Sequence, residues 1–423
     1  MPQPVQIVHD RHRIQFEIDD RIDLWTSNEQ DHQSLGASEF ADAVHDALRH
    51  PTDYPPVSAG IVPGDVVAIV IDAELPQPSS AIAGVLRVLA PLQLSRIDVV
   101  IAESATEQTR ALIRDCLPPG IELTVHSGKS RDDLRYLAAN EAADPIYLNR
   151  RIVDADLVIP LMVARCSDPV LVSSTASPVF PSLADQQSQI RAQVTAQDVI
   201  GVTSKRRATS DDEAARVGWL LGLQWTVLVE VNADGEPSDV YAGTPELVAA
   251  RSRERESGSD SPFAAEIVVA CVDGGQQQQS IMNLLRAALA ARASATSDAT
   301  IVLVSDLSEL GTVVEMDDEV DEEGAESRED GELQPPPSRM TSTDYARKVL
   351  SSLINEMDSS QRYLLFSDCG DDEVEAFGFG AVHDADALAR LINGHGSCIV
   401  IRNAQLASAK AGVSVDSRAP GRN

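Results

Sequence analysis

The sequence predicts an α/β fold made of two Rossmann-like lobes, with mostly parallel sheets flanked by helices and a cleft between the lobes. Short runs of Val, Ile and Leu are continuously apolar rather than alternating. This is typical of parallel strands that are buried on both faces. Ala- and Leu-rich segments of helical length separate the runs, and such an alternation indicates doubly wound sheets. The 423 residues are also enough for two or three domains of ~100–200 residues each.

The expected elements follow this alternation along the chain. A first series of strands is predicted at residues 66–72, 97–102, 122–126 and 156–161. A second series is predicted at residues 225–231, 266–272, 300–305, 363–367 and 397–402. Helices are expected at residues 81–89, 107–116, 281–293, 344–357 and 384–392, where apolar residues recur at helical spacing.

A boundary between the lobes is expected at residues 251–261 (RSRERESGSDS), because this stretch is polar, charged and rich in Gly and Ser. It divides the chain into an N-terminal α/β domain, residues 1–255, and a C-terminal α/β domain, residues 262–410. The second domain is expected to contain an acidic disordered insertion at residues 315–340. Residues 411–423 are expected to form a flexible tail.

The acidic insertion accounts for about a third of the net charge of −32. Residues 315–332 (EMDDEVDEEGAESREDGE) hold eleven acidic side chains against Arg328, a local net charge of −10. Such a segment buries too little apolar surface to become ordered. We expect a solvated linker, or a docking arm for a basic protein partner. The spaced ligand pattern of a Ca²⁺-binding loop is absent from it.

Composition excludes several functional classes. A net charge of −32 argues against a nucleic-acid-binding protein, because phosphate contacts need clustered Lys and Arg. No apolar run reaches the ~20 residues of a membrane-spanning helix, and the first twenty residues lack a signal-peptide core. The five cysteines are odd in number and scattered, which suggests free thiols and a cytoplasmic location. They are Cys116, Cys166, Cys271, Cys369 and Cys398.

Polar side chains come directly after several of the predicted strands. In α/β sheets, ligands bind beyond the carboxyl ends of the strands, where the loops converge. We therefore expect a site at this edge of the first sheet. The residues expected there are Asp72, Glu74, Glu103, Ser104 and Thr106.

Five segments resemble the nickel-pincer-dependent lactate racemase family. Residues 172–184 (VSSTASPVFPSLA) resemble its cofactor-anchoring loop, written SGGxKxxxPGxx. Residues 66–78 (VVAIVIDAELPQP) resemble a strand followed by D-x-T-R-P-x-P, and residues 145–161 (PIYLNRRIVDADLVIPL) resemble P-x-x-x-N-R-x-x-x-x-A-D-L-x-I. Residues 48–64 and 211–243 match further segments, so the similarity spans roughly residues 40–310. The resemblance implies the racemase fold.

The resemblance also implies a role for each position of the anchoring loop. Ser173 keeps the leading serine, and Ser174 and Thr175 replace the two glycines. Pro181 keeps the proline. Ser177 falls on the lysine that carries the covalently attached nickel-pincer nucleotide in the family, and a hydroxyl cannot form that amine-derived linkage.

Most of the remaining family positions are substituted as well. Asp72 keeps the aspartate of the D-x-T-R loop, but Leu75 replaces its arginine, which helps to hold cofactor or substrate. Thr106 and Ser167 fall on the two acid/base histidines of the family, and Gln193 falls on its nickel-ligating histidine.

Two weaker correspondences remain. Residues 274–287 (GGQQQQSIMNLLRA) resemble a G-G-Y-P motif that is followed by a Gln and a Lys; here Arg286 is the nearby cation. His126 resembles a histidine that the family often has at a strand end, and a structural role for it is equally open.

Racemisation at the α-carbon of a 2-hydroxy acid needs two groups that titrate near neutrality and a cation for the carboxylate. Threonine, serine and leucine supply neither. We therefore expect a divergent member of the family without the nickel cofactor and without racemase activity, acting as a pseudoenzyme or a ligand-binding protein. A small anion, either a 2-hydroxy acid or a phosphate, could bind to the hydroxyl-rich loop. The alternatives are an active racemase-like enzyme with a rearranged site, and an interaction scaffold that uses its acidic insertion.

Overall fold

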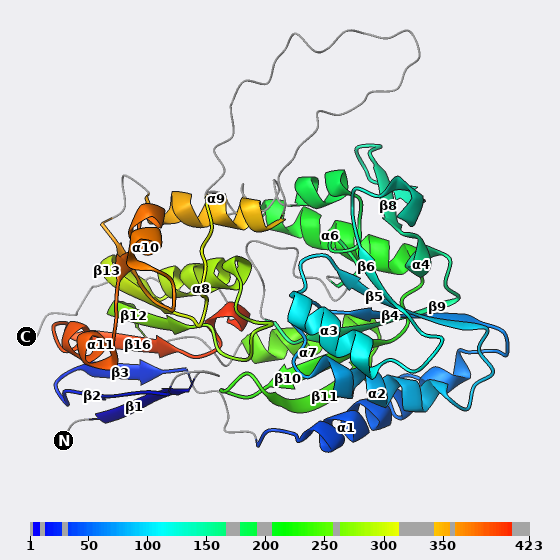
Figure 1. Cartoon of the computed structure of the whole chain (residues 1–423), viewed down its shortest axis with the longest axis horizontal. Helices are drawn as coiled ribbons and strands as arrows, with labels where there is room; N and C mark the ends of the chain where they lie inside the picture. The colour runs from blue at the N-terminus through cyan, green and yellow to red at the C-terminus, as the bar shows by residue number, and fades with distance from the viewer. Residues whose placement is uncertain are drawn as a thin grey trace, which may run out of the picture.

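The computed structural model describes residues 3–8, 13–27, 33–165, 178–192, 205–256, 263–312, 342–355 and 360–407. It contains two lobes, each built on a six-stranded sheet (Figure 1). Helices flank both sheets, and nearly all neighbouring strands are parallel. The predicted α/β fold with two mostly parallel sheets is confirmed.

The first sheet has the order β11-β10-β9-β4-β5-β6, and only β10 and β11 pair antiparallel. Helices α1, α2 and α3 cover one face, while α4 and α6 pack on the other. A hairpin of β7 and β8 precedes α4. The strands are β4 (Val66–Ile71), β5 (Arg96–Ala102), β6 (Leu123–His126), β7 (Leu134–Ala139), β8 (Pro145–Asn149), β9 (Leu157–Val163), β10 (Thr226–Val231) and β11 (Pro237–Gly243). The helices are α1 (Ala37–Arg49), α2 (Pro78–Leu89), α3 (Glu107–Cys116), α4 (Arg150–Val153) and α6 (Lys205–Leu220).

Strand β4 shows why the apolar runs of this sequence are continuous. Ile69 and Ile71 pack into the core under α1 and α2. Ala68 and Val70 point to the opposite face and join the core under α6. Successive side chains of a strand alternate between the two faces, so a strand covered on both faces needs an apolar residue at every position.

The second sheet has the order β15-β14-β13-β12-β16-β3, and all its pairs are parallel. Helices α8 and α9 cover one face, and α11 with the β1–β2 hairpin covers the other. The strands are β1 (Gln3–Val8), β2 (Arg13–Ile18), β3 (Asp23–Thr26), β12 (Ala265–Cys271), β13 (Ala295–Val304), β14 (Arg362–Phe366), β15 (Gly380–Ala381) and β16 (Ser397–Ile401). The helices are α8 (Ile281–Ala293), α9 (Ser342–Ile354), α10 (Asp371–Phe377) and α11 (Ala385–Ile392).

Two segments connect the lobes, one before and one after the part of the chain that forms the first lobe. Strand β3 lies beside β16, with Trp25 opposite Ile399, so the second sheet takes its edge strand from the N-terminal part of the chain. On the other side, helix α7 (Pro245–Glu256) packs on β10 and β11 and includes residues 251–256 of the expected boundary. Arg and Glu are good helix formers, which explains why a charged stretch is helical here. The division at residues 255 and 262 stays a prediction.

Other expectations fall outside the described residues. Residues 313–341 contain nearly all of the expected acidic insertion, and residues 408–423 contain the expected tail; neither range is described. In the part of the chain that is described, no helix combines the length and the apolar character needed to cross a membrane.

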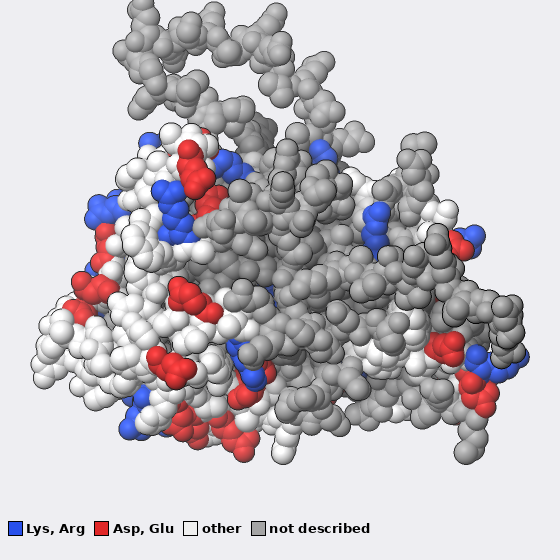
Figure 2. All heavy atoms as spheres, turned by 180° about the vertical axis from the view of Figure 1, so that it is seen from behind, with Lys and Arg blue, Asp and Glu red and all other residues white. Residues whose placement is uncertain are grey.

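The face seen from behind in Figure 2 carries acidic and basic side chains close together. Several of the charged groups on the described surface are paired with one another, for example Arg21 with Asp19 and Arg87 with Asp42. Exposed pairs of this kind contribute little to stability. The buried charges between the lobes are therefore of greater interest.

Candidate functional site

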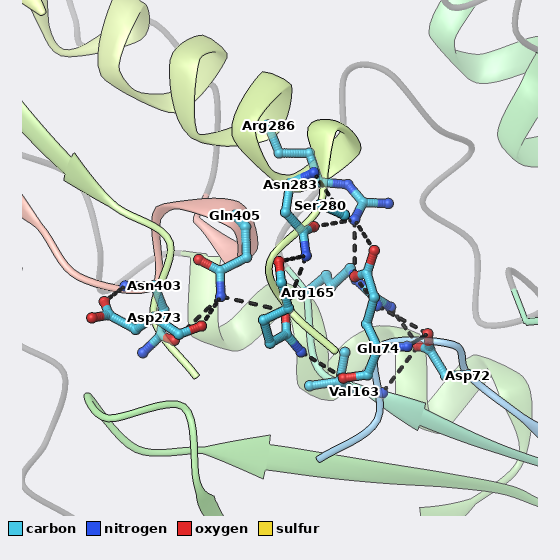
Figure 3. Close-up of polar contacts among 11 residues, drawn as sticks. Asp72, Glu74, Val163, Arg165, Asp273, Ser280, Asn283, Arg286, Asn403 and Gln405 are labelled. Atoms are coloured by element: carbon cyan, nitrogen blue, oxygen red, sulfur yellow. Dashed lines mark hydrogen bonds and ion pairs between the residues drawn. The ribbon is translucent and has the colours of Figure 1, made fainter. Parts of the chain in front are cut away.

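Three loops meet where the two lobes touch (Figure 3). Two of them follow the neighbouring strands β4 and β9 of the first sheet, and the third follows β12 and leads into α8 of the second lobe. All three loops begin at the carboxyl ends of parallel strands, which is where ligands bind in α/β folds. Polar side chains from these loops contact one another, and this cluster is the candidate site.

The loop after β4 carries two carboxylates in a fixed turn. The Asp72 N–H donates to the Leu161 carbonyl at 2.9 Å and extends the pairing of β4 with β9 by one residue. The Asp72 carboxylate accepts from the Glu74 N–H at 3.1 Å and from the Val163 N–H at 3.3 Å. A side-chain bond to the backbone two residues onward is the Asx turn, which fixes the local path of the chain. The Glu74 side chain then extends toward the second lobe (Figure 3).

Arg165, two residues after β9, binds both of these carboxylates. Its Nη1 lies 2.6 Å from Asp72 Oδ2 and its Nη2 lies 3.1 Å from Oδ1, which makes a two-pronged pair. The same Nη2 lies 2.6 Å from Glu74 Oε2. The side chains are 12% (Arg165), 9% (Asp72) and 14% (Glu74) exposed. Planar guanidinium groups favour this arrangement because their donors match carboxylate geometry.

The second lobe contributes Arg286 from α8. Its Nη1 lies 2.8 Å and 2.9 Å from the two carboxylate oxygens of Glu74. Asn283, one turn earlier on α8, accepts from the same Nη1 at 2.6 Å and holds the guanidinium in place. Gln278 Nε2 donates to the main-chain carbonyl of Glu74 at 2.5 Å. The second lobe therefore binds both the side chain and the backbone of Glu74.

Charge decides the protonation states in this cluster. Burial acts to raise the pKa of Glu74, but the positive charges of Arg286 and Arg165 outweigh it and lower that pKa to about 2. Burial would also lower the pKa of Arg165, but Asp72 and Glu74 hold it above its ordinary value. Glu74 and Arg165 are therefore charged at neutral pH. The formal charges of Asp72, Glu74, Arg165 and Arg286 sum to zero.

A second contact between the lobes lies beside this cluster. Asp273, which is fully buried after β12, accepts from Arg402 Nε at 3.0 Å and 3.1 Å. Arg402 Nη2 reaches into the first lobe and donates to the Ala233 carbonyl at 2.8 Å. In the same place a Cβ on Gly235 would lie 2.5 Å from Gly274 Cα, so the two backbones approach as closely as glycine allows.

The run of four glutamines after β12 contributes to the cluster around Glu74. Gln278 Oε1 accepts from Asn283 Nδ2 at 3.1 Å, in addition to the bond that Gln278 makes to Glu74. Gln279 Nε2 donates to the Val272 carbonyl at 3.1 Å, and Gln279 Oε1 accepts from Ser305 Oγ at 2.7 Å. These two glutamines fix the loop that carries α8 toward the first lobe.

Residues 9–164 match the model of the lactate racemase N-terminal domain. The expected resemblance to the lactate racemase family is confirmed for this segment, which makes up 156 of the 423 residues. The matched range contains β4, β5 and β9 and the loop that carries Asp72 and Glu74. No curated protein matches the chain.

Solved structures support the same fold over the whole length of the chain. The structure of the lactate racemase apoprotein from Thermoanaerobacterium thermosaccharolyticum is similar at a TM-score of 0.66 and 12% identity, and the similarity covers 96% of this chain and 99% of that chain. A structural-genomics structure of a Thermotoga maritima protein is similar at a TM-score of 0.56 and 11% identity, covering 84% and 93% of the two chains. At such identities the likeness shows the fold alone.

The family positions in the loop after β4 have different environments. Asp72 lies in the cluster, as expected from its place at the strand end. Leu75, which the resemblance places on the family arginine, is fully buried in the core with α1 and α2. Glu74 falls on the threonine of the D-x-T-R pattern and adds a carboxylate next to Asp72. The guanidinium at Asp72 comes instead from Arg165, which lies two residues after the adjacent strand β9.

Thr106, which the resemblance places on a family acid/base position, has a structural role in α3. Its Oγ1 accepts from the Thr109 N–H at 3.1 Å and caps the N-terminus of α3. It also lies 2.8 Å from the Thr109 hydroxyl. Threonine is a favoured residue at this helix position because its oxygen satisfies a backbone donor that has no partner within the helix.

The remaining expected positions fall outside the described residues. They are Ser167, Ser173, Ser174, Thr175, Ser177 and Gln193. Pro181, which keeps the proline of the resembled loop, is described and is buried. Across the described residues, no group of three or more His, Cys, Asp and Glu side chains is arranged to hold a metal ion.

His126, at the end of β6, has a structural role. Its Nε2 lies 2.9 Å from the Ala184 carbonyl and its Nδ1 lies 3.2 Å from Asn149 Nδ2. The carbonyl must accept and the amide NH₂ must donate, so the ring is neutral with its proton on Nε2. Burial lowers the pKa of His126 and favours this form. The ring therefore joins β6 to β8 and to the segment around Ala184.

Sequence reasoning missed Arg165, the residue that organises the cluster. A signal was present, because Arg165 follows the predicted strand 156–161 closely and therefore lies at the same sheet edge as Asp72. Glu74 and Arg286 were singled out from the sequence, but their contact joins residues 212 positions apart and only the packing of the two lobes reveals it.

Proposed function

We propose that this protein keeps the fold of the lactate racemase family and does not carry out nickel-dependent racemisation of 2-hydroxy acids. One observation carries the proposal. The side chain at the family acid/base position, Thr106, is the N-cap of α3 and is bonded to the Thr109 N–H. Its oxygen is committed to the helix, and a hydroxyl does not exchange protons usefully near neutral pH.

The carboxylate clamp is changed as well. Leu75 replaces the family arginine and is part of the hydrophobic core, so its reversion would place a cation among apolar side chains. Arg165 and Arg286 carry positive charge nearby, but Asp72 and Glu74 neutralise it. An anionic ligand would have to displace one of these carboxylates to bind.

The residues do not fit the nickel-pincer group that the family uses. Its covalent attachment needs an amine, and Ser177 offers a hydroxyl; its metal needs an imidazole, and Gln193 offers an amide, whose oxygen is a poor nickel ligand. We propose a ligand-binding role without turnover, and a cytoplasmic location, which suits the free thiols of Cys116, Cys271, Cys369 and Cys398.

The test uses the whole protein co-expressed with the enzymes that make the family cofactor. Metal analysis of the purified protein and a chiral assay of D- and L-lactate are the two readouts. The lactate racemase of Thermoanaerobacterium thermosaccharolyticum, prepared in the same way, serves as the positive control. We expect neither stoichiometric nickel nor interconversion. Nickel at one ion per chain together with interconversion of the two lactates would overturn the proposal.

A further inference from the structure

We propose that a groove on the first lobe binds a zwitterionic α-amino acid with an uncharged polar side chain. The groove has a volume of about 350 Å³ and lies between α4, β6 and the 3₁₀ turn η2 (Arg131–Asp133). Small-molecule sites usually have volumes of ~300–1,000 Å³, so the groove suits a ligand of this size. Its lining side chains in the described part of the chain are all polar or charged. The inference goes beyond the proposed function, because it concerns another place in the fold and involves neither nickel nor lactate.

The groove is separate from the junction of the lobes. Arg96, which lines it, is the first residue of β5 and lies opposite Val66, the first residue of β4. Asp72 comes six residues after Val66, so about 20 Å of strand separate the two positions at ~3.3 Å per residue. Figure 1 shows α4 on the side of the first lobe that faces away from the second lobe. A ligand in the groove therefore leaves the ion pairs around Glu74 untouched.

Strand β5 and helix α4 supply positive charge to the groove. Asp98, whose side chain is 7% exposed, accepts from Arg96 Nε at 2.8 Å and from Arg151 Nη1 at 3.2 Å. One buried carboxylate therefore orients two guanidinium groups, and the three side chains together have a formal charge of +1. Arg150 adds a second positive charge, and within the described part of the chain no hydrogen bond or ion pair engages its side chain.

The turn η2 supplies negative charge to the same groove. Asp132 lines it, and among the described residues its carboxylate has no partner. Asp133 accepts from the Ser130 hydroxyl at 2.5 Å, a neutral donor that leaves the charge of the carboxylate uncompensated. Asp154, the third acid at the groove, is already paired with Arg135 at 2.6 Å. The charges that remain uncompensated at the groove are therefore two positive and two negative.

This balance of charge decides the kind of ligand. An anion would be attracted by Arg150 and repelled by Asp132, and for a cation the reverse holds. An α-amino acid offers a carboxylate to the guanidinium and an ammonium group to the acids, and it adds no net charge. Hydrogen bonds between charged groups are the stronger ones in proteins. The Thr124 hydroxyl also lines the groove and can bond to a hydroxyl or amide side chain of the ligand.

The experiment measures the binding of L-serine, L-asparagine and L-glutamine to the whole protein by isothermal titration calorimetry. Low ionic strength is used, because salt screens exposed charges. We expect saturable binding of at least one of the three, with a Kd on the order of millimolar, as suits so small a ligand. The N-acetylated form of that amino acid lacks the ammonium group, and its carboxamide lacks the carboxylate. Each analogue should bind at least about tenfold more weakly, because it loses the interaction of one charged end.

Matched variants locate the site. Arg150→Gln and Asp132→Asn remove the two partner charges, and both variants should fold as the native protein does because the side chains are exposed. Each should weaken binding by about tenfold. Arg87→Gln and Asp42→Asn are the controls: they remove the charges of an exposed pair between α2 and α1 in the same lobe and should leave binding unchanged.

Three results would overturn the proposal. One is the absence of saturable binding for all three amino acids. Another is an N-acetylated form or a carboxamide that binds as tightly as the amino acid, which would make the groove a site for simple anions or cations. The third is binding that neither Arg150→Gln nor Asp132→Asn weakens. None of these readouts depends on nickel or on lactate turnover, so they are independent of the test of the proposed function.

Discussion

Arg286 Nη1 lies within 2.9 Å of both carboxylate oxygens of Glu74, and this pair joins α8 of the second lobe to the loop after β4 of the first. The pair belongs to a larger cluster, because Arg165 also binds Glu74 and Asp72 balances the remaining charge. Removing one member of a buried cluster leaves the other charges uncompensated. Each buried charge of the cluster is therefore stable only while the other charges are present.

Glu74→Gln is expected to lower the free energy of unfolding by about 3–5 kcal/mol, the usual cost of breaking a buried ion pair from one side. Glu230→Gln is the matched control, because its partner Arg251 is 40% exposed; a loss of about 1 kcal/mol or less is expected there. Urea titration of both variants measures the difference. Equal losses would contradict a special role of the interlobe cluster.

The acid stability of the protein should depend on Glu74. Its pKa falls from 4.5 to about 2 on folding, so the unfolded chain binds the proton more readily. The stabilisation is complete above pH 4.5 and is lost as the pH falls toward 2. Between about pH 5 and pH 3, the Tm of Glu74→Gln should therefore decline less steeply than that of the native protein, as differential scanning calorimetry would measure. Parallel declines would argue against the ion pairs.

Thr106→Ala should destabilise the protein by about 1 kcal/mol, because α3 loses its N-cap. Thr106→Ser keeps the oxygen and should stay within about 0.5 kcal/mol of the native protein. Chemical denaturation distinguishes the two variants. A Thr106→Ala variant as stable as the native protein would mean that the hydroxyl is not committed to the helix.

His126 should make the protein less stable as the pH falls below about 6.5, the ordinary histidine value. Burial lowers its pKa on folding, so the unfolded chain takes up the proton first and stability declines with decreasing pH. Protonated Nδ1 would also face the Asn149 amide donor. His126→Gln should show a smaller change in Tm between about pH 7.5 and pH 5.5. An unchanged pH dependence would assign the effect to other groups.

Gly235→Ala should weaken the contact between the lobes. Its φ of +75° strains an alanine, and the added Cβ would lie 2.5 Å from Gly274 Cα. Gly222→Ala is the matched control, with φ of +67° and open space around the added Cβ. The first variant should lose more stability than the second by about 1–3 kcal/mol, the cost of overpacking. Similar losses would mean that the backbones separate easily.

The sequence predicts the buried architecture better than the site. The strands from β4 to β16 that are buried on both faces were predicted within a few residues, because a short, continuous apolar run is typical of a strand covered on both sides. Strand β3 was missed: it has only four residues, and its partner β16 lies at the other end of the chain. β15, with two residues, carries no periodicity to detect.

Only the part of the site that depends on local sequence pattern could be predicted. Asp72 and Glu74 could be placed at a strand end from local pattern alone. Their partners could not, because Arg165 and Arg286 reach them from other elements, and a pairing of charges across two lobes leaves no periodic signal. Thr106 was identified as unsuited to acid/base chemistry from its residue type, but its role as a cap depends on backbone geometry.

The position of β3 at the edge of the second sheet affects the order in which the chain can fold. Strands β4 to β11 lie between residues 66 and 243, so the first lobe can form during synthesis as soon as they have left the ribosome. β3 is synthesised before all of them, yet its neighbour β16 begins at Ser397. β3 therefore stays unpaired throughout translation of the first lobe, and its backbone finds its partner only when β16 has been synthesised.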